Sequence, residues 1–217
     1  MRFEQVAQRL SQLPGHLPAA PPSLLPVLLP DDQGLLPSLP WPARPSREAA
    51  VLLLIHPDEQ GLARIVLTER AAGGQRHAGQ VSFPGGAVEE DDESVVAAAL
   101  REAGEEICLD PLAAGLIIVG ELAPVDVRVS DFLVHPVVAT SPGTPRLTAN
   151  EREVAAILHA PLSVFLPSAP IEMVTAERDG FRLRYGAYRL GNDLVWGATA
   201  GILGRLGAFL AHAARRP

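Results

Sequence analysis

Short apolar runs separated by turn-forming residues divide the chain into predicted strands and helices. Aliphatic and β-branched runs predict strands at residues 49–55, 64–69, 80–83, 116–122 and 132–139. Helical spacing of apolar positions predicts helices at 93–107 and 198–214, and residues 151–165 fit either a strand or a short helix. Strands flanked by helices favour an α/β fold with a mixed sheet.

Proline dominates the segment after residues 1–13, which have the pattern of an amphipathic helix. Ten residues from Pro14 to Pro45 are proline, which excludes a long helix and favours an extended backbone. The segment also carries too many large apolar side chains for a disordered tail: Leu24, Leu25, Val27, Leu28, Leu29, Leu35, Leu36, Leu39 and Trp41. We therefore expect residues 1–47 to form a helix and an arm that lies against the body or against a second subunit of a homodimer.

The helix predicted at 93–107 has one apolar face and one acidic face. Its apolar positions recur at helical spacing and predict a buried stripe: Val96, Leu100, Ala103 and Ile107. Glu102, Glu105 and Glu106 stand at i, i+3 and i+4, so the helix projects all three from one side. A packed helix holds such carboxylates in fixed positions, which a metal site requires.

Three neighbouring carboxylates repel one another unless a cation binds them. Hard divalent cations such as Mg²⁺ prefer oxygen ligands and commonly join a few carboxylates to substrate phosphates. The alternative is a solvated acidic face without function, which is the usual meaning of a charged run. Pro84, Gly85 and Gly86 form a tight loop before the helix, where missing side chains let the backbone approach a ligand. This loop and the buried stripe favour the metal site.

The segment from 83 to 109 resembles the Nudix box. That pattern is Gly, five residues, Glu, seven residues, then Arg, Glu, an aliphatic residue, any residue, Glu, Glu, any residue, Gly and an aliphatic residue. The positions that match it are Gly86, Arg101, Glu102, Ala103, Glu105, Glu106 and Leu109. The distance from Gly86 to Arg101 is one residue longer than the pattern, so either Asp92 or Glu93 fills the first acidic place. Cys108 replaces the usual glycine.

The flanking residues resemble the coenzyme A diphosphatases of the Nudix family. The element before the box matches at 67–70, at Arg76 and His77, and at 79–81 and 83–86. Residues 130–137 resemble the central strand, with Asp131 where glycine is expected, and residues 196–203 resemble the closing helix. The resemblance implies that residues 48–217 form a Nudix hydrolase domain with the α/β/α sandwich of that family.

The resemblance also implies which residues hold the metal, Mg²⁺ or Mn²⁺. Glu102 and Glu106 are the expected ligands, with Glu105 as the third ligand or the general base. The carbonyl of Gly86 completes the metal site. Arg101 is expected to orient the glutamates through an i, i+4 pair with Glu105.

Two further expectations concern the base and the substrate. Glu151 or Glu153, in a later loop, competes with Glu105 for the role of base, and we select Glu153 as the candidate. Arg70, Arg76, His77 and Gly85 are expected to bind the substrate, because arginine forks match phosphate oxygens.

The implied reaction is metal-dependent hydrolysis of the diphosphate bond of coenzyme A or its derivatives. Its products would be 3′,5′-ADP and 4′-phosphopantetheine, or the acyl form. The alternatives are a Nudix hydrolase of ADP-ribose, NADH or a dinucleoside polyphosphate, and a noncatalytic Nudix-like binding module. A module of that kind would be expected to lack box glutamates that this chain retains.

Composition restricts the partners and the compartment. The net charge of −7 argues against nonspecific binding to nucleic acid or anionic membrane, so a small molecule is the expected partner. All 18 cationic side chains are arginine. The single cysteine excludes an intramolecular disulfide and fits a reducing compartment. Because the first residues show no apolar secretory core, we expect a cytoplasmic protein.

Overall fold

The computed structural model describes residues 1–30, 36, 44–71, 79–178 and 181–212. The helices are α1 (Phe3–Leu10), α2 (Val95–Ile107) and α3 (Gly197–His212), with 3₁₀ turns at Pro22–Leu24, Arg128–Ser130 and Leu162–Phe165. The strands are β1 (Val27–Leu28), β2 (Arg47–Pro57), β3 (Ala63–Arg70), β4 (Val81–Ser82), β5 (Gly85–Ala87), β6 (Ile117–Glu121), β7 (Val125–Val127), β8 (Phe132–Thr140), β9 (Val154–Pro161), β10 (Glu172–Arg178), β11 (Phe181–Leu190) and β12 (Asp193–Val195).

The larger sheet has the strand order β4-β3-β2-β8-β6, with β9 beside β3, β5 beside the start of β2, and β7 beside the start of β8. β2 and β8 run parallel and the other pairs are antiparallel, so the predicted mixed sheet is confirmed. All five predicted strands are present. Residues 151–165, for which strand and helix were both open, contain β9 and then a 3₁₀ turn.

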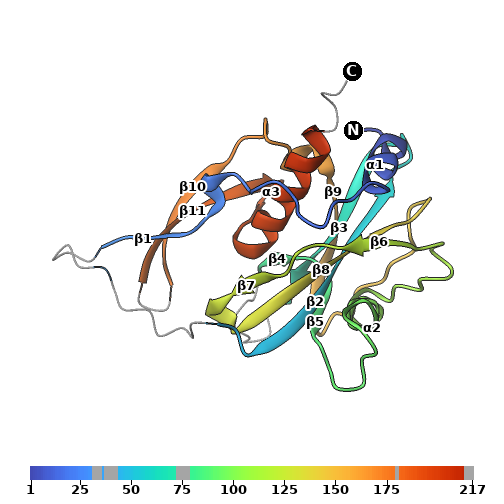
Figure 1. Ribbon diagram of the computed structural model, residues 1–217, viewed down its shortest axis with the longest axis horizontal. Coiled ribbons are helices and arrows are strands. Elements are labelled where there is room, and N and C mark those ends of the chain that lie inside the picture. Colours follow the sequence, from blue (N-terminus) through green and yellow to red (C-terminus); the bar gives the residue numbers. More distant parts are fainter. Residues whose placement is uncertain (31–35, 37–43, 72–78, 179–180, 213–217) are drawn as a thin grey trace.

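Side-chain alternation along β2 places a helix on each face of this sheet. Leu52 and Leu54 pack in one core cluster with Ala103 of α2. Leu53 packs in a second cluster with Leu203 of α3. Both faces are therefore buried, which explains why β2 is continuously apolar instead of alternating. Figure 1 shows α2 and α3 on opposite sides of the sheet, so the predicted α/β/α sandwich is confirmed.

Helix α2 begins where the Ser94 hydroxyl accepts a hydrogen bond from the Ala97 N–H at 3.1 Å. Its buried residues are Ala98, Ala99, Ala103, Glu106 and Ile107. Of the predicted stripe, Ala103 and Ile107 are fully buried, and Val96 and Leu100 are partly buried and pack against the same core cluster. Small alanines let the helix approach β2 closely, and this rotates the buried face toward Glu106.

The N-terminal arm lies against its own chain. Val6 and Leu10 of α1 are fully buried in the core that contains α3. β1 pairs with β11, and the Leu29 N–H donates to the Arg182 carbonyl at 2.8 Å. Of the two expectations for the arm, contact with the body is present in the described part. Leu35, Leu39 and Trp41 lie outside the described residues.

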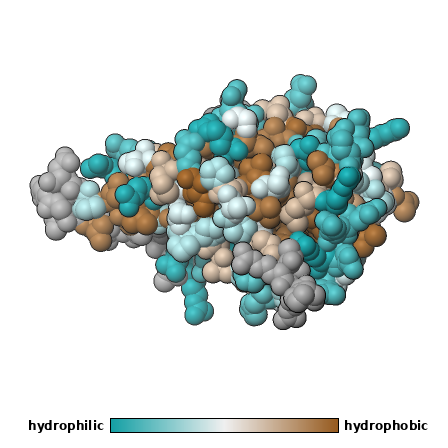
Figure 2. All heavy atoms as spheres, turned by 90° about the horizontal axis from the view of Figure 1, so that it is seen from above, coloured by the Kyte–Doolittle hydropathy of each residue, from teal (hydrophilic) through white to brown (hydrophobic). Residues whose placement is uncertain are grey.

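A second, smaller sheet of β1, β11, β10 and β12 was not predicted from the sequence. Seen from above, its outer part forms a narrow projection with apolar atoms at the surface (Figure 2). Leu25, beside β1, and Val27 and Met173, on β1 and β10, are each more than half exposed. The projection lies far from α2 in Figure 1.

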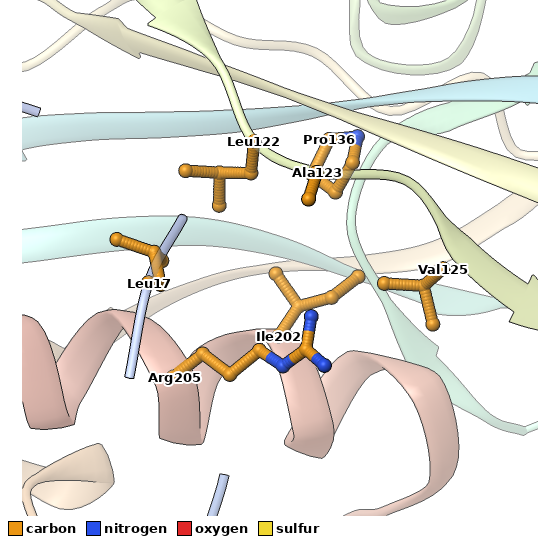
Figure 3. Close-up of a pocket in the computed structure, with 7 residues that line it drawn as sticks. All are labelled: Leu17, Leu122, Ala123, Val125, Pro136, Ile202 and Arg205. Carbon is orange, nitrogen blue, oxygen red and sulfur yellow. The ribbon is translucent and has the colours of Figure 1, made fainter. Parts of the chain in front are cut away.

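The predicted terminal helix is α3, and its buried side chains include Leu203, Leu206 and Leu210. Within the described part of the chain, no helix is long and apolar enough to cross a membrane. A small pocket opens where α3 meets the β6–β7 connection (Figure 3). Its lining is apolar except for one guanidinium: Leu17, Leu122, Ala123, Val125, Pro136, Ile202 and Arg205. The pocket belongs to the α3 side of the sheet, so the box glutamates do not line it.

Candidate active site

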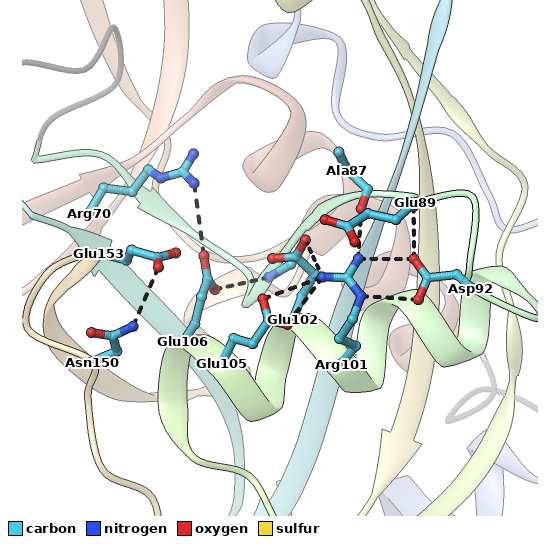
Figure 4. Close-up of polar contacts among 11 residues, drawn as sticks. Arg70, Ala87, Glu89, Asp92, Arg101, Glu102, Glu105, Glu106, Asn150 and Glu153 are labelled. Atoms are coloured by element: carbon cyan, nitrogen blue, oxygen red, sulfur yellow. Dashed lines mark hydrogen bonds and ion pairs between the residues drawn. The ribbon is translucent and has the colours of Figure 1, made fainter.

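Three segments that are distant in sequence meet at the C-terminal turns of α2. They are the glycine loop that enters β5, the end of β3 at Arg70, and the loop before β9 that carries Glu153. Figure 4 shows Arg70 and Glu153 on one side of Glu106, with Arg101 and Asp92 on the other side. The sheet register makes this meeting possible, because β3 pairs Arg70 with Val154, next to Glu153.

Glu106 is the most enclosed carboxylate of this group, with only 5% of its side chain exposed. Its Oε2 accepts a hydrogen bond from the Gly85 N–H at 3.0 Å, and its Oε1 lies 3.8 Å from Nη2 of Arg70. Burial raises the pKa of Glu106 to about 7, and repulsion from Glu102 and Glu153 adds to this. The Gly85 N–H and Arg70 oppose the shift without cancelling it. Glu106 is therefore a buried carboxylate whose described neighbours supply too little positive charge to stabilise its ionised form.

Glu102 lies one turn before Glu106 and directly beneath Gly86. A Cβ added to Gly86 would lie 2.5 Å from the Glu102 carboxyl atoms, so any larger residue here would displace the Glu102 carboxylate. Burial raises the pKa of Glu102, the nearby Arg101 lowers it, and the charges of Glu105 and Glu153 raise it further. Glu102 and Glu106 thus both lie near carboxylates whose negative charges oppose their ionisation.

Arg101 joins the start of the box to its helix. Its Nε and Nη2 donate to the two carboxylate oxygens of Asp92 at 3.0 and 2.9 Å. Its Nη1 donates to Glu102 at 3.0 Å and lies 3.4 Å from Glu105, so the predicted i, i+4 ion pair is present. Asp92, and not Glu93, therefore fills the first acidic place. The hydrogen bonds from Arg101 lower the pKa of Asp92.

Glu105 has a more open environment than the other box glutamates, with 55% of its side chain exposed. Its described contact is the pair with Arg101. Glu153, by contrast, acts electrostatically on both Glu102 and Glu106. Of these two candidates for the base, Glu105 acts more strongly on Glu102, but only Glu153 is among the charges that act on Glu106.

The Glu153 loop is anchored to the end of α2. The N–H groups of Thr148 and Asn150 donate to the carbonyls of Ile107 and Glu106 at 3.0 and 2.9 Å. These bonds satisfy carbonyls that a helix end leaves without partners. The Asn150 amide lies 3.4 Å from the Glu153 carboxylate, and the Ala71 N–H donates to the Glu153 carbonyl. Sequence reasoning missed Asn150, because its role depends on tertiary contacts that no local pattern encodes.

The carboxylates fit a divalent cation that keeps part of its water shell. Among the described residues, no three acidic, histidine or cysteine side chains converge into a complete metal cage. Mg²⁺ does not need one, since one or two carboxylates with water and substrate phosphates usually hold it. Glu102 and Glu106 supply such carboxylates, and their raised pKa values show that positive charge would stabilise their ionised forms.

Of the four predicted substrate residues, Arg70 and Gly85 are among the described residues. Arg76 and His77 lie outside the described residues. Arg70 and Gly85 both contact Glu106, so the structure brings these two predicted substrate residues to the predicted metal ligands.

Comparisons with known proteins show the family to which the chain belongs. The NUDIX domain model matches residues 45–177. The Nudix hydrolases NudL of Enterobacter sp. and Cronobacter sakazakii are 42% and 44% identical over 161 residues, which is 74% of this chain and 81% of each relative. The crystal structure of RenU, a Nudix hydrolase from M. smegmatis, shares the fold, with a TM-score of 0.52 and 17% identity over 88% of this chain and 97% of that one. This chain therefore belongs to the Nudix hydrolase family, enzymes that act on nucleoside diphosphate derivatives and generally use divalent metal ions.

Proposed function

We propose that the chain hydrolyses the diphosphate bond of coenzyme A or its derivatives, releasing 3′,5′-ADP and 4′-phosphopantetheine or its acyl form. One observation carries this proposal. The segment that resembles coenzyme A diphosphatases spans residues 67–86, and both of its ends contact Glu106. Arg70 lies 3.8 Å from one carboxylate oxygen of Glu106, and the Gly85 N–H donates to the other. The element that distinguishes the subfamily thus flanks the buried carboxylate of the box.

Glu102 and Glu106 would hold Mg²⁺ or Mn²⁺, with the Gly86 backbone beside them. The cation would supply positive charge against the diphosphate and would lower the pKa of water at the site. Arg101 positions Glu102 through their 3.0 Å hydrogen bond. Arg70, with 37% of its side chain exposed, is placed to reach a substrate phosphate.

Glu153 is our proposal for the general base that removes a proton from the attacking water. Its charge acts on both Glu102 and Glu106, whereas the charge of Glu105 acts on Glu102 and its carboxylate pairs with Arg101. A base must lie within hydrogen-bond reach of the water that it activates. The anchored loop at Asn150 keeps Glu153 beside the buried pair.

The test is to incubate the purified chain with Mg²⁺ or Mn²⁺ and a panel of coenzyme A, ADP-ribose, NADH and a dinucleoside polyphosphate. Mass spectrometry identifies the products. We expect the highest kcat/KM for coenzyme A or an acyl derivative, with 3′,5′-ADP as a product. A higher kcat/KM for ADP-ribose or another member of the panel would contradict the substrate assignment, and no turnover at all would favour a binding module.

A further inference from the structure

The contact between Arg70 and Glu106 places a positive side chain at the position where a cation is needed. Nη2 of Arg70 lies 3.8 Å from Oε1 of Glu106, while Oε2 of Glu106 is occupied by the Gly85 N–H. Oε1 is thus the oxygen available to a cation. Arg101 is engaged with Asp92, Glu102 and Glu105, so among the described residues the charge opposite Oε1 comes from Arg70.

The backbone of Arg70 is fixed, but its guanidinium is not. The Arg70 N–H donates to the Gln80 carbonyl at 3.1 Å, and the Gly79 N–H donates to the Arg70 carbonyl at 3.0 Å. The next residue, Ala71, donates its N–H to the Glu153 carbonyl. The side chain is 37% exposed, and its ion pair with Glu106 is longer than a close hydrogen-bonded pair. The guanidinium can therefore leave Glu106 by side-chain rotation alone.

We propose that Arg70 is a built-in counter-ion of Glu106 that a divalent cation must displace. A guanidinium and a metal ion cannot both occupy the space opposite Oε1. Arg70 therefore weakens metal binding in the substrate-free enzyme. Displacement leaves its guanidinium available to an anionic substrate group. This inference rests on the proposed function in one respect, namely that Glu102 and Glu106 hold the cation.

Coupling between metal and substrate follows from this exchange. A substrate phosphate that binds Arg70 removes the competitor from Glu106 and so tightens the binding of the cation. By linkage, the cation tightens the binding of the substrate by the same factor. The enzyme would then assemble its metal site most completely when the diphosphate is present.

Mn²⁺ binding in the absence of substrate tests the inference, with free Mn²⁺ measured by electron paramagnetic resonance at pH 8. We expect Arg70→Gln to bind Mn²⁺ about fivefold more tightly than the wild type, the size of a partly screened charge pair. Arg70→Met, which keeps the aliphatic stem without the charge, should give the same result if Arg70→Gln folds poorly. The matched control is Arg64→Gln, because Arg64 lies on the same strand and pairs with Asp58 at 2.8 Å.

The outcomes separate this inference from the function on which it rests. Unchanged or weaker Mn²⁺ binding in both Arg70 variants would overturn the counter-ion role, since a purely structural or substrate-binding arginine predicts one of those results. Glu106→Gln should lose Mn²⁺ binding. If Glu106→Gln binds Mn²⁺ as the wild type does, the assigned metal ligands are wrong, whatever the Arg70 variants show.

Discussion

Arg101 and Asp92 form a two-point ion pair, with Nε to Oδ1 at 3.0 Å and Nη2 to Oδ2 at 2.9 Å. The pair connects the loop before α2 to the turn of α2 that carries Glu102. The same guanidinium donates to the Ala87 carbonyl at 3.0 Å, at the end of β5. Arg101 therefore fixes the glycine loop and the helix relative to each other. By spacing alone, either Asp92 or Glu93 could be the first acidic residue of the box. The contact with Arg101 selects Asp92.

Replacing Asp92 should disturb this connection, whereas replacing Glu93 should not. We expect Asp92→Asn to lower the free energy of unfolding by about 1–3 kcal/mol, because it removes charge-assisted hydrogen bonds from the partly buried Arg101. Turnover should also fall, because Arg101 is no longer held by Asp92 in the position where it bonds Glu102. Urea unfolding and initial rates provide the measurements. Glu93→Gln, at an exposed position with no described side-chain bond, is the control. Equal effects of the two substitutions would be inconsistent with the assignment.

Glu153 and Glu105 can be separated by their kinetics. Because Glu153 is the proposed general base, Glu153→Gln should lower kcat by about 10²- to 10⁴-fold. Glu105→Gln should cost much less, because the Glu105 side chain is 55% exposed and its described contact is with Arg101. Steady-state kinetics at saturating Mg²⁺ give both values. A larger loss in Glu105→Gln than in Glu153→Gln would transfer the role of base to Glu105.

The raised pKa of Glu106 predicts how stability depends on pH in the metal-free protein. Its folded-state pKa is about 7 against a reference value of 4.5, so the native state binds more protons between these values. The resulting stabilisation is complete below pH 4.5 and is lost as pH rises through 7. Its size is roughly 3 kcal/mol at most. Glu106→Gln should therefore gain stability relative to the wild type as pH rises from 5 to 8.

Urea unfolding in the presence of a chelator measures this difference at pH 5 and pH 8. The difference in the free energy of unfolding between the wild type and the mutant cancels the contributions of carboxylates with lowered pKa values, such as Asp58 and Asp131. Saturating Mn²⁺ should reduce the advantage of the mutant at pH 8, because the cation binds the ionised carboxylate of the wild type. The same difference at both pH values would mean that Glu106 is not perturbed by burial.

Cys108 and Asp131 are the two described non-glycine residues with positive φ, at 50° and 60°. Both stand where the family pattern has glycine. Cys108 ends α2 in the left-handed conformation, and the N–H of the next residue, Leu109, donates to the Ala103 carbonyl at 3.2 Å. We expect Cys108→Gly to raise the free energy of unfolding by about 0.5–1 kcal/mol, because glycine has no Cβ to strain this conformation. Cys108→Ala, which removes the thiol but keeps the Cβ, should show no such gain. If both variants unfold alike, backbone strain at Cys108 is not significant.

The sequence predicts the main sheet and the box helix well, because their signals are local. Residues 49–55 of β2 and 65–67 of β3 are apolar runs. The three glutamates of α2 follow helical spacing. The second sheet was missed although Leu183, Tyr185 and Ala187 alternate with more polar or smaller neighbours along β11. Gly191 and Asn192 also form a two-residue turn between Leu190 and Asp193, which is a recognised hairpin signal.

The site was predicted less completely than the fold, because its assembly depends on register. Arg70 and Glu153 meet only because β3 pairs with β9 at Arg70 and Val154. The buried face of α2 also includes Ala98, Ala99 and Glu106, which the predicted stripe left out. The sequence contains these residues, but it does not contain the distances between them.

If Glu106 holds the cation for hydrolysis of the coenzyme A diphosphate bond, Glu106→Gln should be nearly inactive even at saturating Mg²⁺. The measurement compares coenzyme A hydrolysis by the wild type, by Glu106→Gln and by Glu90→Gln, which changes an exposed glutamate outside the site. We predict a loss of about a thousandfold or more in Glu106→Gln and no change in Glu90→Gln. In metal-free buffer at pH 8, the melting temperature of Glu106→Gln should be at least as high as that of the wild type. A rate for Glu106→Gln within tenfold of the wild-type rate would mean that Glu106 does not hold the catalytic cation.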